Sequence, residues 1–336
     1  MLRENGGNSV FGHSWSQRFW KRNGFTNRAA TSKMRDLPAE FDKKKETYIR
    51  IAAKLIRKHN IPADLVHGID ETNALFVSQK NRTMSKRGAK RIRLLGKGSD
   101  KAQITVTLGV TEAGLVLPPQ YIFGGKTTRC HPNTIPPKGS IFTHSISHWQ
   151  TEETFIIYIQ RVLVPYKTAT IQRLGLPSNQ VSLLKLDLHY SHKTVKVLEL
   201  LEDNNIKVLF VPARCTDEFQ ECDTVINKPF KSGMKAAFRD FLHNDFNNYK
   251  GDPTNWSIKL TMGNLKDHIV DFVETGMNTI RAPEYATVIR NAFQSHGRFE
   301  EIRGVDDKLR ERLLTSSAPF RTLTAGADDE AQLAAG

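Results

Sequence analysis

Cysteine is scarce in this sequence. Only Cys130, Cys215 and Cys222 are present among 336 residues, and no two of them form a Cys-x-x-Cys pair. Their odd number and irregular spacing favour reduced thiols and argue against a disulfide framework or a zinc finger. Cys130 is followed by His131, but two adjacent residues of ligating type are alone a weak indication of a metal site.

Long apolar runs are also lacking. No stretch approaches the roughly 18 apolar residues of a membrane span. Residues 1–25 are polar and charged, without the apolar segment of a secretory signal. The 39% hydrophobic and 25% charged residues are typical of a folded soluble protein. We therefore expect a protein that stays inside the cell and contacts no membrane.

Acidic residues are outnumbered by basic ones, 35 to 49, which gives a formal net charge of +14. Such an excess attracts polyanions, and nucleic acid is the commonest one in cells. The alternative is a basic protein that its charge keeps soluble. Residues 80–101 hold nine basic residues against one acid. This stretch is either a solvated loop or a segment that follows a phosphate backbone, and residues 86–93 also suit a nuclear-import signal.

The N-terminal region carries a second basic segment. Residues 14–24 read as a helix that begins at Ser14, ends at Gly24 and places Trp15 and Phe19 on one stripe. Basic residues cover its other faces and continue to residue 35. The pattern suits either DNA contact or a small helical linker.

Periodicity along the rest of the chain predicts a mixed α/β sheet. Residues 38–60 form an amphipathic helix, strands begin near residue 63, and residues 104–123 form a hairpin. A loop over 124–148 follows, then a helix over 151–174 that Pro165 should kink or break. A strand ending at residue 186, a helix over 193–204, a strand over 206–212 and a helix over 228–246 come next. This alternation implies a sheet with helices on both faces.

Three aspartates lie at the ends of these elements. Asp187 follows the apolar run 181–186 directly, Asp70 lies in the strand Gly68-Ile-Asp-Glu-Thr72, and Asp223 precedes the helix that begins near Lys228. Carboxylates are the preferred ligands of Mg²⁺, and two ions held about 3.5–4 Å apart can stabilise both oxygens of a phosphoryl displacement. A metal-dependent nuclease is one interpretation; surface or turn aspartates are the other.

The motifs Gly68-Ile-Asp-Glu-Thr72, Leu186-Asp-Leu-His-Tyr-Ser-His192 and Gln220-Glu-Cys-Asp-Thr-Val-Ile-Asn-Lys-Pro-Phe-Lys231 resemble those of the DDE/D transposases. The likeness is greatest to the pogo-like branch, which includes centromere protein B and the jerky-type proteins. The resemblance implies an RNase H-like core in which Asp70, Asp187 and Asp223 are catalytic and bind two Mg²⁺ or Mn²⁺ ions. Asp217 is the rival third acid, but its position fits the motif less well.

The resemblance also implies an activity and partners. The enzyme would cut double-stranded DNA at transposon ends, and the freed 3′-OH would attack target DNA. Location in the nucleus is expected, and a homodimer stays open beside a monomer. The alternatives are a catalytically inactive DNA-binding or chromatin protein derived from a transposase, and a structure-selective nuclease. The chain departs from the family pattern at Glu221-Cys222, where Pro-Leu is common, and at Leu188, where Asn is frequent.

These expectations divide the chain into five parts. Residues 1–13 are disordered, 14–60 hold a partial helix-turn-helix segment and a connecting helix, and 61–250 form the RNase H-like core. Residues 251–303 are a helical extension, and 304–336 are a largely disordered tail. The candidate DNA contacts share a positive charge and a place in a basic segment or near the third acid: Arg18, Lys21, Arg22, Arg28, Lys86, Arg87, Lys90, Arg91, Arg93, Lys228 and Lys231.

Overall fold

A computed structural model describes residues 15, 18, 19, 22, 23, 40–77, 103–252, 255–258 and 260–297. The chain divides into two units, residues 1–37 and 38–336. In the first unit, the rings of Trp15 and Phe19 stack with centroids 5.3 Å apart, and the Asn23 backbone N–H donates to the Phe19 carbonyl at 3.1 Å. These contacts have helical i,i+4 spacing, as the sequence predicts.

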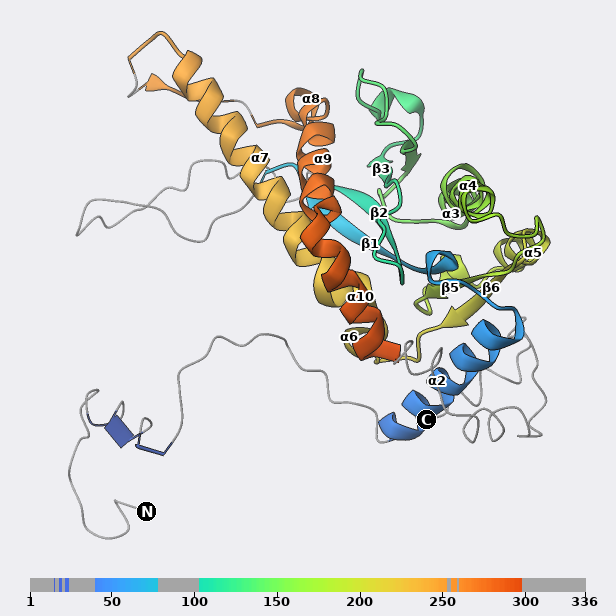
Figure 1. The fold of residues 1–336 in the computed structure, drawn as a ribbon. Helices are drawn as coiled ribbons and strands as arrows, with labels where there is room; N and C mark the ends of the chain where they lie inside the picture. The colour runs from blue at the N-terminus through green and yellow to red at the C-terminus, as the bar shows by residue number, and fades with distance from the viewer. Residues whose placement is uncertain are drawn as a thin grey trace. The chain divides into compact units, whose positions relative to one another are not determined.

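The second unit is built on one six-stranded sheet (Figure 1). Its strands are β1 (Val66–Leu75), β2 (Gln103–Thr111), β3 (Gln120–Gly124), β4 (Ile141–Ser145), β5 (Ser182–Leu186) and β6 (Ile206–Phe210). They lie in the order β4-β3-β2-β1-β5-β6. β1 pairs antiparallel with β2 and parallel with β5, so the sheet is mixed and β1 is central. This architecture confirms the RNase H-like fold class.

Helices cover both faces of this sheet, and each face has its own core. On one face lie α2 (Phe41–Lys58), α6 (Thr216–Phe219), α7 (Asn227–Asn248), α9 (His268–Arg281) and α10 (Pro283–Gly297). On the other lie α3 (Glu152–Tyr158), α4 (Val164–Leu174) and α5 (Val195–Asp203). A short helix, α8 (Met262–Leu265), precedes α9. Side chains of β1 alternate between the two faces of the sheet. Val66 and Ala74 therefore pack into the first core, and Ile69 packs into the second.

The C-terminal helices pack closely on one another. α7 and α9 run side by side in Figure 1. Gly233 and Gly276 make this approach possible, since a Cβ on Gly276 would lie 2.7 Å from the Phe230 carbonyl oxygen. α2, α9 and α10 all contribute to the first core. The helix expected over 38–60 is thus part of the same hydrophobic core as the sheet.

Two local expectations differ from the structure. Residues 124–148 are not a continuous loop, because β4 forms within them and pairs parallel with β3 at Phe123 and His144. The chain stays helical past Pro165 and is not broken there, although α-helical hydrogen bonding gives way to π-helical bonding just before it. It runs through a π-helical segment, Ile159–Leu163, and Pro165 lies in the first turn of α4, where its missing N–H is tolerated. No helix within the described part of the chain is long and apolar enough to cross a membrane.

Candidate acid site

Asp70 and Asp223 meet on one face of the sheet. Asp70 is 8% exposed in the middle of β1. The Asn227 side-chain amide donates to Asp223 Oδ1 at 2.9 Å and lies 3.4 Å from Asp70 Oδ2, so it joins the two acids. The buried Gln220 amide donates to Asp70 Oδ1 at 3.2 Å. The two carboxylates therefore share one polar environment, although 153 residues separate them in the chain.

Asp187 lies beside this pair because of strand register. β1 and β5 are parallel, with Gly68 opposite Lys185. Two further residues along both strands bring Asp70 to the level of Asp187, and adjacent strands are about 4.8 Å apart. Asp187 follows the last residue of β5, so its side chain is partly exposed, at 33%. The structure thus brings all three predicted aspartates to one region of the sheet.

A buried histidine holds Asp187. His192 Nδ1 lies 2.7 Å from Asp187 Oδ1, and its Nε2 lies 3.3 Å from Glu71 Oε1. Burial opposes the charged ring, but the charges and hydrogen bonds of Glu71 and Asp187 outweigh it and raise the pKa of His192 to about 10. A protonated ring donates from both nitrogens. His192 therefore links Asp187 to Glu71, which points to the opposite face from Asp70, as strand alternation predicts.

The electrostatics of Asp70 suit a cation. Burial raises the pKa of Asp70 well above its ordinary value, and the neighbouring Asp223 raises it further. For Asp187, burial is opposed by the hydrogen bond and charge of His192, which together hold its pKa below the ordinary value. A divalent cation between such acids would relieve their repulsion. Hard carboxylate oxygens, one buried and two reaching solvent, fit Mg²⁺ or Mn²⁺.

The three aspartates do not converge on a single point. In the part of the chain that the structure describes, only Cys130, His131 and His144 bring three ligand atoms within 4.8 Å of one another. Asp187 is turned toward His192 instead.

Asp223 owes its position to a π-helical turn. The segment Cys222–Ile226 has π-helical hydrogen bonding and leads directly into α7. π-Helical turns insert one residue into a helix and are frequent at functional sites. The rival acid, Asp217, lies in α6, and its side chain is outside the described part of the structure.

The candidate DNA contacts are only partly within the described residues. Lys228 and Lys231 lie on the first turns of α7. Burial lowers the pKa of Lys231, while the charges of Asp223 and Asp70 oppose that shift, so this amine lies close to the acids. Arg18 and Arg22 are in the first unit. Lys21, Arg28, Lys86, Arg87, Lys90, Arg91 and Arg93 lie outside the described residues.

The departure at Glu221 has a structural explanation. Glu221 forms an ion pair with Lys185 of β5, and the two side chains are 0% and 1% exposed. Gly68 of β1 leaves room for the carboxylate, because a Cβ there would lie 2.7 Å from Glu221 Oε2. The Lys185 ammonium also lies 4.9 Å from the centroid of the Phe293 ring. Glu221 therefore stands at a position where the family pattern has an apolar residue, and the buried Lys185 ammonium neutralises its charge.

Sequence analysis missed the residues that support the acids. Asn227 stands four residues after Asp223, a spacing that places both on one helical face, so it could have been found. Glu71 could not, since it reaches His192 from another element.

Comparison with known proteins identifies a family for most of the folded region. The family model described as DDE superfamily endonuclease matches residues 101–274, slightly more than half of the chain. The human and mouse proteins named "Pogo transposable element with KRAB domain" are each 26% identical over 228 residues. The 228 matched residues make up 68% of this chain but only 36% of each relative. A human "Pogo transposable element with ZNF domain" is 22% identical over the same length, which is 15% of that protein.

The solved structures that the chain matches include two of Mos1. The mariner paired-end complex with Mn has a TM-score of 0.46 at 12% identity, covering 88% of this chain and 76% of that chain. The catalytic domain with Raltegravir and Mg has a TM-score of 0.37 at 12% identity, covering 78% and 98%. The chain spans little more than a third of the human and mouse pogo relatives with a KRAB domain. On the family match over residues 101–274, this chain belongs to the DDE superfamily endonucleases.

Proposed function

We propose that the chain is the catalytic region of a transposase that cuts and joins DNA with two divalent metal ions. The observation that carries this proposal is the sharing of one polar site by Asp70 and Asp223, with Asp187 at the same level on the neighbouring strand. When bound, the ions would activate the attacking oxygen and stabilise the leaving one.

The roles of the chain's own residues follow from their contacts. Asp70, Asp187 and Asp223 would supply the metal-binding oxygens. His192 is a positioning residue, since its short contact to Asp187 Oδ1 fixes that carboxylate. Asn227 orients Asp223 in the same way.

The DNA partner is proposed from charge. The net charge of +14 and the lysines beside Asp223 would hold phosphates near the acids. Double-stranded DNA, as both transposon end and target, is the proposed substrate, and location in the nucleus and pairing into a homodimer accompany this proposal. Arg18, Arg22 and the basic segment over 80–101 are further proposed contacts.

Nicking of supercoiled plasmid in Mn²⁺ tests the proposal. Wild-type protein should convert supercoiled to open-circular DNA, and Asp187→Asn should abolish this while its circular dichroism and DNA retention persist. Asp203→Asn, a change at an exposed aspartate at the end of α5, is the matched control and should nick like wild type. Equal nicking by the wild type and Asp187→Asn would refute the catalytic role.

The second candidate is a DNA-binding or chromatin protein without catalysis. The departures at Glu221 and Leu188 from the family pattern favour it. It predicts that wild type and Asp187→Asn retain DNA equally and that neither nicks it. Loss of DNA retention at raised salt in both would support phosphate contacts, because the logarithm of the binding constant falls linearly with the logarithm of the salt concentration when phosphates are bound.

A further inference from the structure

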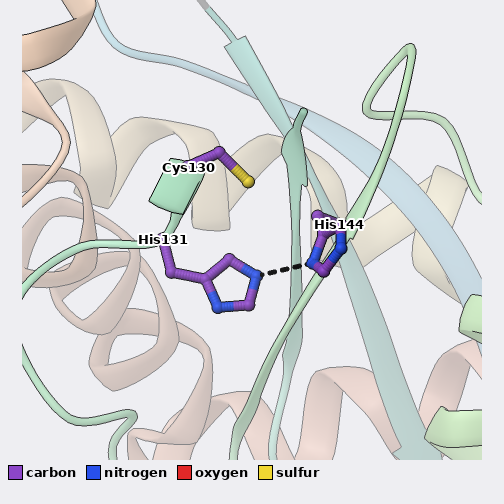
Figure 2. A group of neighbouring side chains, drawn as sticks. All are labelled: Cys130, His131 and His144. Atoms are coloured by element: carbon purple, nitrogen blue, oxygen red, sulfur yellow. Dashed lines mark hydrogen bonds between the residues drawn. The ribbon is translucent and has the colours of Figure 1, made fainter. Parts of the chain in front are cut away.

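A second group of metal-ligating side chains lies at the edge of the sheet, away from the acids. Cys130, His131 and His144 each offer one ligand atom, and these atoms all lie within 4.8 Å of one another. Figure 2 shows the three side chains around a common space, Cys130 on a short helical turn and His144 on β4. The strand β4 is separated from the Asp70 strand by β3 and β2.

The spacing of the donors fits a tetrahedral ion. His131 Nε2 and His144 Nδ1 are 3.1 Å apart. Two ligands at about 2.0–2.1 Å from a tetrahedral zinc ion are roughly 3.3 Å apart. Small movements of side chains that are each only partly buried would therefore admit an ion between them.

The backbone and the aromatic surroundings hold this geometry. His144 is fixed opposite Phe123 by the parallel pairing of β3 and β4. The ring of His131 packs against Phe123 and Phe142, with centroids 5.6 and 6.1 Å away. Gly125 leaves room for the thiol, because a Cβ there would lie 2.9 Å from Cys130 Sγ.

We propose that Cys130, His131 and His144 form a zinc site distinct from the acid site. Thiolate and imidazole ligands select Zn²⁺ over Mg²⁺ and Mn²⁺, which prefer oxygen. The described residues give three donors, so a fourth position is available to water or another donor.

The ion would fix the connection between β3 and β4. The same connection is already bound to the start of α9, since Lys266 Nζ donates to the His131 carbonyl at 3.3 Å and the Asn133 N–H donates to Asp267 Oδ1 at 2.8 Å. Zinc would therefore join the sheet edge to the segment that leads into the C-terminal helices. This role is independent of DNA cleavage.

The test measures metal content in the untagged full chain. Protein is stripped with chelator, loaded with Zn²⁺, dialysed and analysed by mass spectrometry. Wild type should retain one zinc per chain. Cys130→Ser and His144→Gln should bind far more weakly, because loss of a residue that merely orients a ligand already costs about 10–100-fold in affinity.

Matched variants separate this site from other binding. Cys215→Ser and His148→Gln, which change a cysteine and a histidine outside the group, should retain zinc, as should Asp187→Asn. Loading with Co²⁺ should give a thiolate-to-metal charge-transfer band that Cys130→Ser lacks. The proposal is wrong if wild type retains no zinc, or if Cys130→Ser and His144→Gln, folded by circular dichroism, retain as much as wild type.

Discussion

The buried ion pair between Lys185 and Glu221 makes the sharpest prediction about stability. Both side chains are almost completely buried. Removal of one partner leaves the other charge buried without the opposite charge of the ion pair, which costs about 3–5 kcal/mol. We expect Lys185→Met and Glu221→Leu each to lose this amount. That is a large share of the roughly 5–15 kcal/mol by which domains are stable.

The double variant should behave differently. Replacing both partners by apolar residues of similar volume is often neutral or stabilising by about 1–4 kcal/mol. We therefore expect Lys185→Met/Glu221→Leu to unfold at a urea concentration equal to or above that of wild type. Because each single variant loses at least about 3 kcal/mol and the double variant loses nothing, the coupling energy in the double-mutant cycle should be at least about 6 kcal/mol.

Urea unfolding followed by circular dichroism measures these differences. The pair Lys207–Glu202 is the control, since its ammonium and carboxylate are 2.6 Å apart but the Glu202 side chain is 55% exposed. Breaking it should cost no more than about 1 kcal/mol. If the effects of Lys185→Met and Glu221→Leu simply add, the pair is not coupled and the reasoning fails.

Three further predictions concern other sites. Burial lowers the pKa of His67 to about 3, below its unfolded value, so stability falls as pH drops below about 6.5. The loss from this residue between pH 8 and pH 5 is about 2 kcal/mol. His67→Phe should reduce that pH dependence in urea melts; an unchanged slope would contradict it. Gly276→Ala should destabilise by about 1–3 kcal/mol, because its Cβ meets the Phe230 carbonyl at 2.7 Å; a thermal melt no lower than wild type would refute this. Asp223→Asn should raise the melting temperature in chelator by removing repulsion on Asp70 and reduce stabilisation by Mg²⁺, and a lower melting temperature in chelator would count against it.

Local pattern predicted most of the fold. The alternation over residues 104–110 and the apolar run before Asp187 mark strands that local residue types determine. β4 escaped prediction because Pro136, Pro137 and Gly139 precede it. Its five residues pair only with β3, and this pairing is a tertiary contact that the local sequence does not encode.

The three aspartates could be predicted from the sequence, but the residues that hydrogen-bond to them or pair with their neighbours could not. Asp187 could be placed because it ends an apolar strand. The role of its partner His192 could not be predicted, since nothing near it in sequence reveals Glu71 on another strand. Lys185 shows the same limit: within an apolar run it is an exception, and its partner lies 36 residues away.

The π-helical turn Cys222–Ile226 makes the third aspartate sensitive to chain length. Each residue of a helix turns the chain by about 100°. Deleting one residue after Asp223 would let α7 wind as an ordinary helix, but it would swing that carboxylate around the axis and away from Asp70. The hydrophobic core would survive such a deletion while the acid pair separated. The proximity of Asp223 to Asp70 therefore depends on the exact number of residues in this turn, which the packing of the core does not fix.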